Sequence, residues 1–139
     1  MSPKALAESW VRLWSQTDSA AFVSIFDEAI VYEDAAFSIR REGRSALQEH
    51  HRIWLAAAPD FSIEIEQLHE AGDTVIVQGL GRGTFSGEDL AGGALKATGK
   101  GFEGRLAAVI VCGEKGILKC TEYYDRLQMP GISAGAAGA

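Results

Sequence analysis

Two carboxylic acids stand at positions from which they could transfer protons. Asp34 lies near the end of a segment rich in β-formers, residues 29–35, and Glu122 lies in the last alternating segment of the chain. Because side chains alternate along a strand, Cys120, Glu122 and Tyr124 share one face. A carboxyl group buried in an apolar pocket is disfavoured as a charge, so its pKa rises toward neutrality, which suits an acid or a base. Asp34 and Glu122 are therefore candidate proton-transfer groups, with Tyr124 as a candidate stabilising group.

Both acids also have purely structural interpretations. Aspartate is common in turns and at helix caps, which would account for Asp34. Glu122 could be a surface charge, or could form an ion pair with Arg82 or Arg105. These alternatives stay open at the level of sequence.

Two adjacent histidines, His50 and His51, fall in a segment with helical periodicity. Neighbouring helical residues point about 100° apart, so only one of the two can face a pocket. His51 shares an apolar stripe with Leu47 and Trp54, and is the histidine we favour as a catalytic group that shuttles protons. A buried core histidine is the alternative interpretation. A metal site would need three converging ligands, which two neighbouring histidines do not supply, so we expect no metal.

Large apolar side chains could wall a hydrophobic pocket. A subset of them lining a cavity would imply a hydrophobic substrate held mainly by burial. The candidate substrate-binding residues are Trp10, Trp14, Tyr32, Trp54, Phe102 and Cys120. Plain core packing is the alternative for most of them.

The first half of the chain has helical patterns. Ser2 followed by proline predicts a helix start, and its apolar stripe runs through Leu6, Trp10, Leu13 and Trp14. Asp18 is expected to cap a second short helix. Ser45, with Gln48 three residues later, fits a capping box that opens a third helix, which Pro59 ends.

The second half alternates with a period of two. Strands are expected at residues 61–66, 74–85, 102–112 and 117–127, with a glycine-rich connection at 86–101. Helices followed by an antiparallel meander predict an α+β fold, a cone-shaped curved antiparallel sheet covered by N-terminal helices. Three glycines on one strand face (Gly79, Gly81 and Gly83) leave a hollow for a ligand or a second subunit, or simply allow the sheet to bend.

Composition limits the function further. The 139 residues suit one domain, which we place at 1–129, followed by a disordered tail of small residues at 130–139. A net charge of −6 argues against nucleic acid and against an anionic membrane surface. The opening residues do not resemble a signal peptide, and we expect a cytoplasmic protein. Its two cysteines, Cys112 and Cys120, fall on neighbouring expected strands; we expect reduced thiols, with a disulfide between them as the alternative.

Several segments in order carry a family resemblance. They are residues 26–34 (FDEAIVYED), 42–47 (EGRSAL), 58–61 (APDF) and 122–125 (EYYD). From about Ala5 to Met129 the chain resembles the SnoaL-like polyketide cyclase branch of the nuclear-transport-factor-2-like superfamily. The resemblance implies a cystatin-like α+β barrel, an inward-facing Glu122 and a homodimer.

Enzymes of this superfamily differ from the chain at named positions. Ketosteroid isomerase has its base where this chain has Asp34, but its oxyanion-hole tyrosine and partner acid correspond to Trp10 and Ala107. Polyketide cyclases and limonene-type epoxide hydrolase carry an aspartate where Glu122 stands. The hydrolase also requires an Arg-x-Asp that residues 77–81 (VQGLG) lack.

We therefore expect a cofactor-independent enzyme that acts on a hydrophobic small molecule by carboxylate-mediated proton transfer, as a cyclase or isomerase. Asp34 or Glu122 would remove the proton, and Tyr124 and His51 would stabilise or reprotonate the intermediate. The alternatives are a hydrolase or dehydratase using the same pocket, and a small-molecule binding protein without chemistry.

Overall fold

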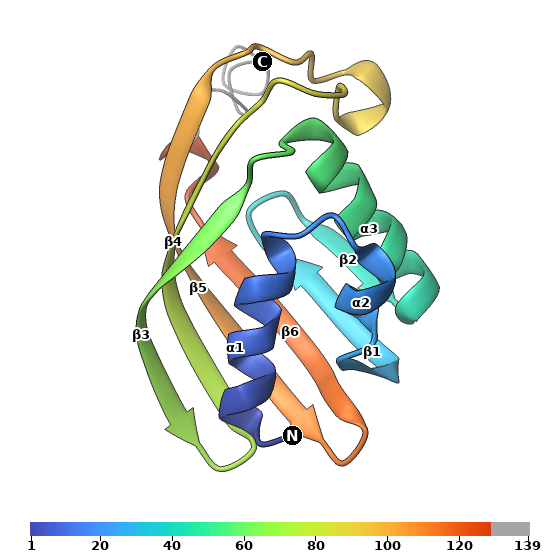
Figure 1. Cartoon of the computed structure of the whole chain (residues 1–139), viewed down its shortest axis with the longest axis vertical. Coiled ribbons are helices and arrows are strands. Elements are labelled where there is room, and N and C mark those ends of the chain that lie inside the picture. Colours follow the sequence, from blue (N-terminus) through green and yellow to red (C-terminus); the bar gives the residue numbers. More distant parts are fainter. Residues whose placement is uncertain (129–139) are drawn as a thin grey trace.

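A six-stranded sheet curves around three helices in the computed structural model, which describes residues 1–128 (Figure 1). The predicted α+β fold is confirmed, and the sheet is strongly curved but not closed. The expected tail at 130–139 lies outside the described residues. Among those residues, no helix has the length and apolar character needed to cross a membrane.

Side chains cap the first turns of two of the three helices. In α1 (Pro3–Trp14), the Ser2 hydroxyl accepts a hydrogen bond from the Ala5 amide. Asp18 caps α2 (Ser19–Val23) in the same way, as expected. The predicted capping box of α3 (Arg44–Ala57) is wrong. Gly43 occupies the cap position with a φ of 85°, and Ser45 lies inside the first turn.

The strand order in the sheet is β2-β1-β6-β5-β4-β3. Four of the five pairings are antiparallel, and the pairing of β1 with β6 is parallel. The short second strand was not anticipated from the sequence, since its charged residues break the usual β composition. The strands are β1 (Phe26–Asp34), β2 (Ile39–Glu42), β3 (Ser62–Ala71), β4 (Thr74–Thr84), β5 (Gly101–Gly113) and β6 (Gly116–Tyr124).

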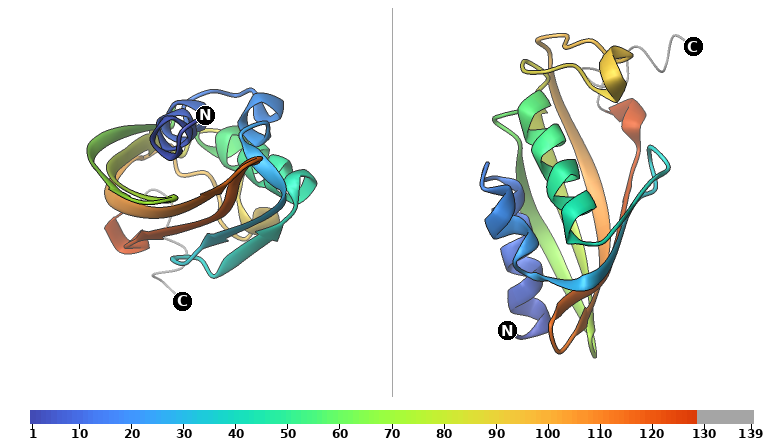
Figure 2. Two further views of the ribbon diagram at one scale, coloured as in Figure 1. Left: turned by 90° about the horizontal axis from the view of Figure 1, so that it is seen from below. Right: turned by 90° about the vertical axis from the view of Figure 1, so that its right-hand side faces the viewer.

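The three helices lie on the concave side of the sheet (Figure 2). Helix α1 packs across β3, β4 and β5, while α3 packs against α2 and the β1–β2 pair. The connection from β4 to β5 carries a short 3₁₀ turn, η1 (Ala91–Gly93), beyond the C-terminal end of α3 (Figure 1). Hydrogen bonds from Gly87 N to Ala57 O and from Glu88 N to Ala56 O, each 2.9 Å, fix this connection to the helix.

The three strand glycines lie on the concave face. A side chain added at Gly81 would contact Phe61 and Leu106, and one added at Gly83 would meet Phe102 at 2.9 Å. Neighbouring side chains therefore fill the hollow that the glycines leave, not a second subunit. This allows bulky residues of adjacent elements to turn toward the interior.

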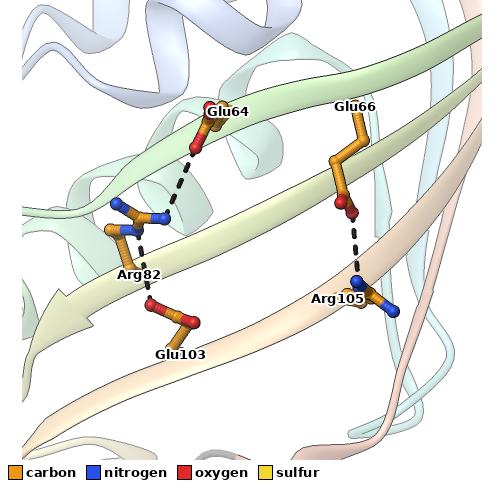
Figure 3. Close-up of polar contacts among 5 residues, drawn as sticks. All are labelled: Glu64, Glu66, Arg82, Glu103 and Arg105. Atoms are coloured by element: carbon orange, nitrogen blue, oxygen red, sulfur yellow. Dashed lines mark hydrogen bonds and ion pairs between the residues drawn. The ribbon is translucent and has the colours of Figure 1, made fainter.

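Ion pairs cover the convex face of β3, β4 and β5 (Figure 3). They join Glu64, Glu66, Arg82, Glu103 and Arg105. Arg82 lies between Glu64 at 3.4 Å and Glu103 at 3.6 Å, and Arg105 pairs with Glu66 at 3.5 Å. The alternative that Arg82 or Arg105 pairs with Glu122 is therefore wrong.

Candidate active site

Strand register brings the two candidate acids together. Asp34 of β1 is the register partner of Glu122 on the parallel strand β6, and Ala35 N donates to the Glu122 carbonyl at 3.0 Å. Both side chains line one cavity of about 420 Å³ on the concave side. The site thus depends on the one parallel pairing in the sheet.

A buried hydroxyl holds Glu122 in place. Tyr32 donates a short hydrogen bond to Glu122 Oε1. Its oxygen accepts from two indoles, Trp10 Nε1 at 3.0 Å and Trp14 Nε1 at 3.1 Å. A tyrosine hydroxyl has one proton, and both of its acceptor positions are taken by the indoles. The Tyr32 proton must therefore point to Glu122, which leaves the second carboxyl oxygen, Oε2, available to the cavity.

Asp34 receives a different set of partners. Tyr124 donates to Asp34 Oδ2 at 2.6 Å, and the Phe37 amide donates to Oδ1 at 3.1 Å. Tyr124 and Glu122 come from the same face of β6, as the alternation predicts. Each acid is therefore paired with a tyrosine from the other strand.

The surroundings separate the acidities of the two carboxyl groups. Burial, reinforced by the charge of Asp34, raises the pKa of Glu122 to about 8, against a small lowering by the Tyr32 hydrogen bond. Burial also raises the pKa of Asp34, but hydrogen bonds from Tyr124 and from the Phe37 and Ala36 amides lower it. More donors stabilise the Asp34 charge, so Asp34 ionises first and Glu122 keeps its proton near neutral pH.

The two tyrosines stay neutral beside these acids. Burial and the neighbouring carboxylates hold the pKa of Tyr32 and that of Tyr124 well above the usual value. Both therefore act as hydrogen-bond donors in the structure, and Glu122 is the group that can exchange a proton at physiological pH.

The adjacent histidines separate as helix geometry requires. His50 lines the cavity, and burial together with the charge of Arg41 lowers its pKa to about 4. His51 is buried in the core, where Nε2 donates to the Leu13 carbonyl at 2.9 Å and Nδ1 accepts from the Ser19 hydroxyl at 2.7 Å. The structure thus places His50, and not the favoured His51, at the cavity.

Only some of the expected wall residues reach the cavity. Trp14 and Trp54 line it, whereas Trp10, Tyr32, Phe102 and Cys120 lie outside its lining. Trp10 and Tyr32 serve the site indirectly, through the hydrogen bonds to Glu122. Both cysteines are buried free thiols.

Sequence reasoning missed several lining residues. Ile39 and Arg41 project into the cavity from β2, a strand that was not expected. Their alternation with Arg40 and Glu42 was the available signal. Other missed residues come from β3 and the residues before it, from the loop after β1, and from the β4–β5 connection, whose residues 88–95 are called the strap below. They are Phe37, Phe61, Ile63, Glu88, Asp89, Leu90 and Leu95.

The position assigned to a second isomerase acid also needs correction. Ala107 is paired with Gln78 and with the exposed Tyr123, so it belongs to the convex face. The concave-face residues of β5 at this level are Leu106 and Ala108, and neither carries an acid. Among residues 1–128, no three His, Cys, Asp or Glu side chains converge as a metal site would require.

Comparisons with known proteins agree with this architecture. The model of the SnoaL-like domain matches residues 7–121. No curated protein matches the sequence.

Solved structures share the fold at low sequence identity. A hypothetical protein from Catenulispora acidiphila with a ketosteroid isomerase-like fold, in complex with trimethylamine, is 19% identical, with a TM-score of 0.80 over 96% of this chain and 95% of that one. IdmH from Streptomyces antibioticus, provisionally assigned as a polyketide cyclase, is 17% identical, with a TM-score of 0.78 over 99% of both chains. A provisional SnoaL-like polyketide cyclase from Shewanella denitrificans is 11% identical, with a TM-score of 0.79 over 99% and 98%.

Proposed function

Because the chain belongs to the SnoaL-like domain family, we propose that it is a cofactor-independent enzyme that transfers a proton on a hydrophobic small molecule, as a cyclase or isomerase. One observation carries the proposal. Two carboxyl groups on paired strands line one cavity, and the pKa of Glu122 is about 8 while Asp34 is the stronger acid. A base and an acid are therefore present together at neutral pH.

The roles follow from the hydrogen bonds. Ionised Asp34 removes a proton from a carbon next to a substrate carbonyl, and the C–H electron pair moves into an enolate. Protonated Glu122 donates from Oε2 to the carbonyl oxygen, where negative charge develops. Tyr32 keeps Oε1 occupied, so the Glu122 proton is directed to the substrate side.

The enolate then has two outcomes within the cavity. When a C=C bond of the substrate is conjugated with the enolate, return of the proton from Asp34 to the far end of that dienolate moves the double bond and gives an isomer. Attack of the enolate carbon on a second carbonyl of the same molecule, with Glu122 protonating the new alkoxide, closes a ring. In both cases the aromatic walls, including Trp14, Trp54 and Phe61, restrict water around the intermediate.

Deuterium exchange tests the proton-transfer step without knowledge of the true substrate. The protein is incubated in D₂O with a panel of hydrophobic aryl ketones and 1,3-diketones, and loss of the α-proton signal is followed by ¹H NMR. We expect Asp34→Asn to abolish enzyme-dependent exchange and Glu122→Gln to reduce it about 10²–10⁴-fold. Glu33→Gln is the matched control, because that half-buried side chain lies outside the cavity lining and pairs with Arg40 at 3.5 Å.

The same panel separates the alternatives. Full exchange in both variants would refute the mechanism. Solvent ¹⁸O appearing in a product would indicate hydrolysis instead. Tight ligand binding that Glu122→Gln leaves unchanged, with no exchange and no product, would indicate a binding protein.

We also propose a homodimer formed through the convex face of the sheet. Ile76 and Tyr123 are 37% and 51% exposed there, and the register sets them beside Val109 and Ala107. An apolar patch at the centre of a charged sheet face is typical of an interface between copies. Light scattering after size-exclusion chromatography should give twice the monomer mass, and Ile76→Glu should reduce it to that of the monomer. A monomeric wild-type protein would refute this assignment.

A further inference from the structure

The cavity contains one arginine whose charge is not used by the fold. Arg41 is partly buried and lines the cavity from β2, where it is the register partner of Tyr32. The next position on that face, Ile39, pairs with Asp34. The guanidinium therefore enters the same cavity as the candidate acids. It comes from the strand next to β1, two residues along from the position that pairs with Asp34.

The other arginines all have partners in the structure. Arg40, its neighbour on the opposite face, pairs with Glu33 and Glu42, and Arg44 donates to the Phe26 carbonyl. Arg41 makes no hydrogen bond and no carboxylate ion pair with any residue in 1–128, and its charge acts on His50, whose pKa it lowers. Asp34, Glu88 and Asp89 line the same cavity, but none of them forms an ion pair with Arg41. A partly buried guanidinium with no paired carboxylate is unfavourable, which indicates that a ligand supplies the paired charge.

His50 adds a second unused donor. The centroid of its ring lies 6.0 Å from that of Trp14, in an edge-on arrangement, and 5.8 Å from that of Tyr32. Within the described residues the His50 ring makes no hydrogen bond. Burial and the Arg41 charge keep it neutral, so it offers one N–H without adding a second positive charge. Arg41 and His50 together can hold two oxygens of one anionic group.

We infer that Arg41 and His50 bind a carboxylate of the substrate, so that the molecules turned over are hydrophobic monoanions carrying this carboxylate apart from the carbon that loses its proton. Binding of a carboxylate does not depend on the proposed function. The statement that such molecules are turned over rests on it. The carboxylate pairs with Arg41, while Asp34, which accepts from Tyr124 and the Phe37 amide, stays free of the guanidinium and acts as the base. A neutral hydrophobic compound of the same shape would leave the guanidinium unpaired.

Equilibrium binding of matched probes tests the inference. The ligands are 2-naphthoate, which is ionised at pH 7, and its neutral isostere 2-naphthamide, followed by quenching of tryptophan fluorescence, since Trp14 and Trp54 line the cavity. A charge-assisted hydrogen bond strengthens binding, so we expect wild-type protein to prefer the carboxylate by about tenfold or more. Arg41→Gln should remove most of that preference, and Arg41→Lys should retain part of it.

Arg40→Gln is the matched control, because it removes the same charge from the adjacent position on the opposite face. Its preference for 2-naphthoate should equal that of wild type. Equal affinity for the two probes in wild type, an unchanged preference in Arg41→Gln, or an equal loss in Arg40→Gln would each overturn the inference. Circular dichroism confirms that each variant is folded.

The binding test of the anion site can fail or succeed independently of the deuterium-exchange test of the proposed function. The preference for the carboxylate requires no proton transfer, so Asp34→Asn should keep or increase it while abolishing deuterium exchange. A preference for 2-naphthoate in a wild-type protein that exchanges no α-proton would support the anion site and refute the enzyme.

Discussion

Tyr32 donates its only hydroxyl proton to Glu122, because both of its acceptor positions are taken by the indole N–H groups of two tryptophans. The direction of this hydrogen bond decides which oxygen of Glu122 faces the cavity as a donor. By resemblance Trp10 corresponds to the oxyanion-hole tyrosine of ketosteroid isomerase, but in this structure it lies outside the cavity lining and its indole donates to Tyr32. The oxyanion donor in the proposed mechanism is consequently a neutral carboxylic acid.

Tyr32→Phe tests this arrangement. Loss of the hydroxyl leaves two buried indole donors without an acceptor, so the free energy of unfolding should fall by about 1–3 kcal/mol for each. The Tyr32 hydrogen bond lowers the pKa of Glu122, so its removal should move that pKa upward from about 8. Urea denaturation and ¹³C NMR of the carboxyl group measure the two effects. Tyr123→Phe, on the convex face, is the control, and an unmoved pKa in Tyr32→Phe would contradict the assignment.

The stability of the protein should depend on the protonation of Glu122. Its folded-state pKa of about 8 lies above its ordinary value of 4.5. The stabilisation from the protonated acid is therefore complete below pH 4.5 and is lost as the pH rises through 8. In that window, the free energy of unfolding of wild type should fall relative to Glu122→Gln by up to about 1.4 kcal/mol per pH unit.

Denaturation of both proteins at several pH values measures this difference. The lowered pKa of His50 also contributes to the free energy of unfolding, with the opposite pH dependence: this stabilisation is lost as the pH falls from 6.5 to about 4. Both proteins contain His50, so its contribution cancels in the difference between them. Parallel pH profiles would show that Glu122 is ionised in the native state.

The two adjacent histidines should give opposite phenotypes. His51→Leu leaves the Ser19 hydroxyl and the Leu13 carbonyl without their partner, so it should destabilise the fold by about 1–3 kcal/mol while 2-naphthoate binding persists in the folded protein. His50→Leu should weaken 2-naphthoate binding and leave the free energy of unfolding nearly unchanged. Urea denaturation and fluorescence titration of each variant check both statements. Weakened binding in His51→Leu alone would reverse the assignment.

The strap (residues 88–95), which lines the cavity, should be held against α3 by the small size of Gly87. A side chain there would overlap the Ala56 carbonyl oxygen, which accepts from the Glu88 amide at 2.9 Å. Gly87→Ala should therefore detach the strap from α3 and speed the dissociation of 2-naphthoate in stopped-flow fluorescence. Gly101→Ala, at the other end of the same connection, meets only an ordinary contact at 3.8 Å and should behave as wild type.

The sequence predicted the fold and the faces of its strands, since both follow from local periodicity. The alternation in β6 placed Glu122 and Tyr124 together, and Asp18 capped α2 as its residue type suggested. The pairing of β1 with β6 could not be read in the same way, because no turn joins the two strands and parallel register leaves no local pattern. Tyr32 was therefore expected as a wall residue and not as the partner of Glu122.

Two other features needed the structure for different reasons. Helical spacing shows that His50 and His51 diverge, but their direction depends on how α3 is rotated against α2 and the sheet. Arg41 lies in a strand of four residues whose charges resemble a loop. Its inward position became visible only from its register with Tyr32.

The two hydrogen bonds that join the candidate acids to their tyrosines each span 90 positions in the chain. Strand β1 lies between β2 and β6, so during synthesis it has only a four-residue neighbour until the sixth strand is made. Such long-range pairing is slow to form and leaves a strand edge open in the meantime. A nascent chain that has not reached β6 therefore lacks both of these hydrogen bonds, and the proposed proton transfer requires the complete sheet.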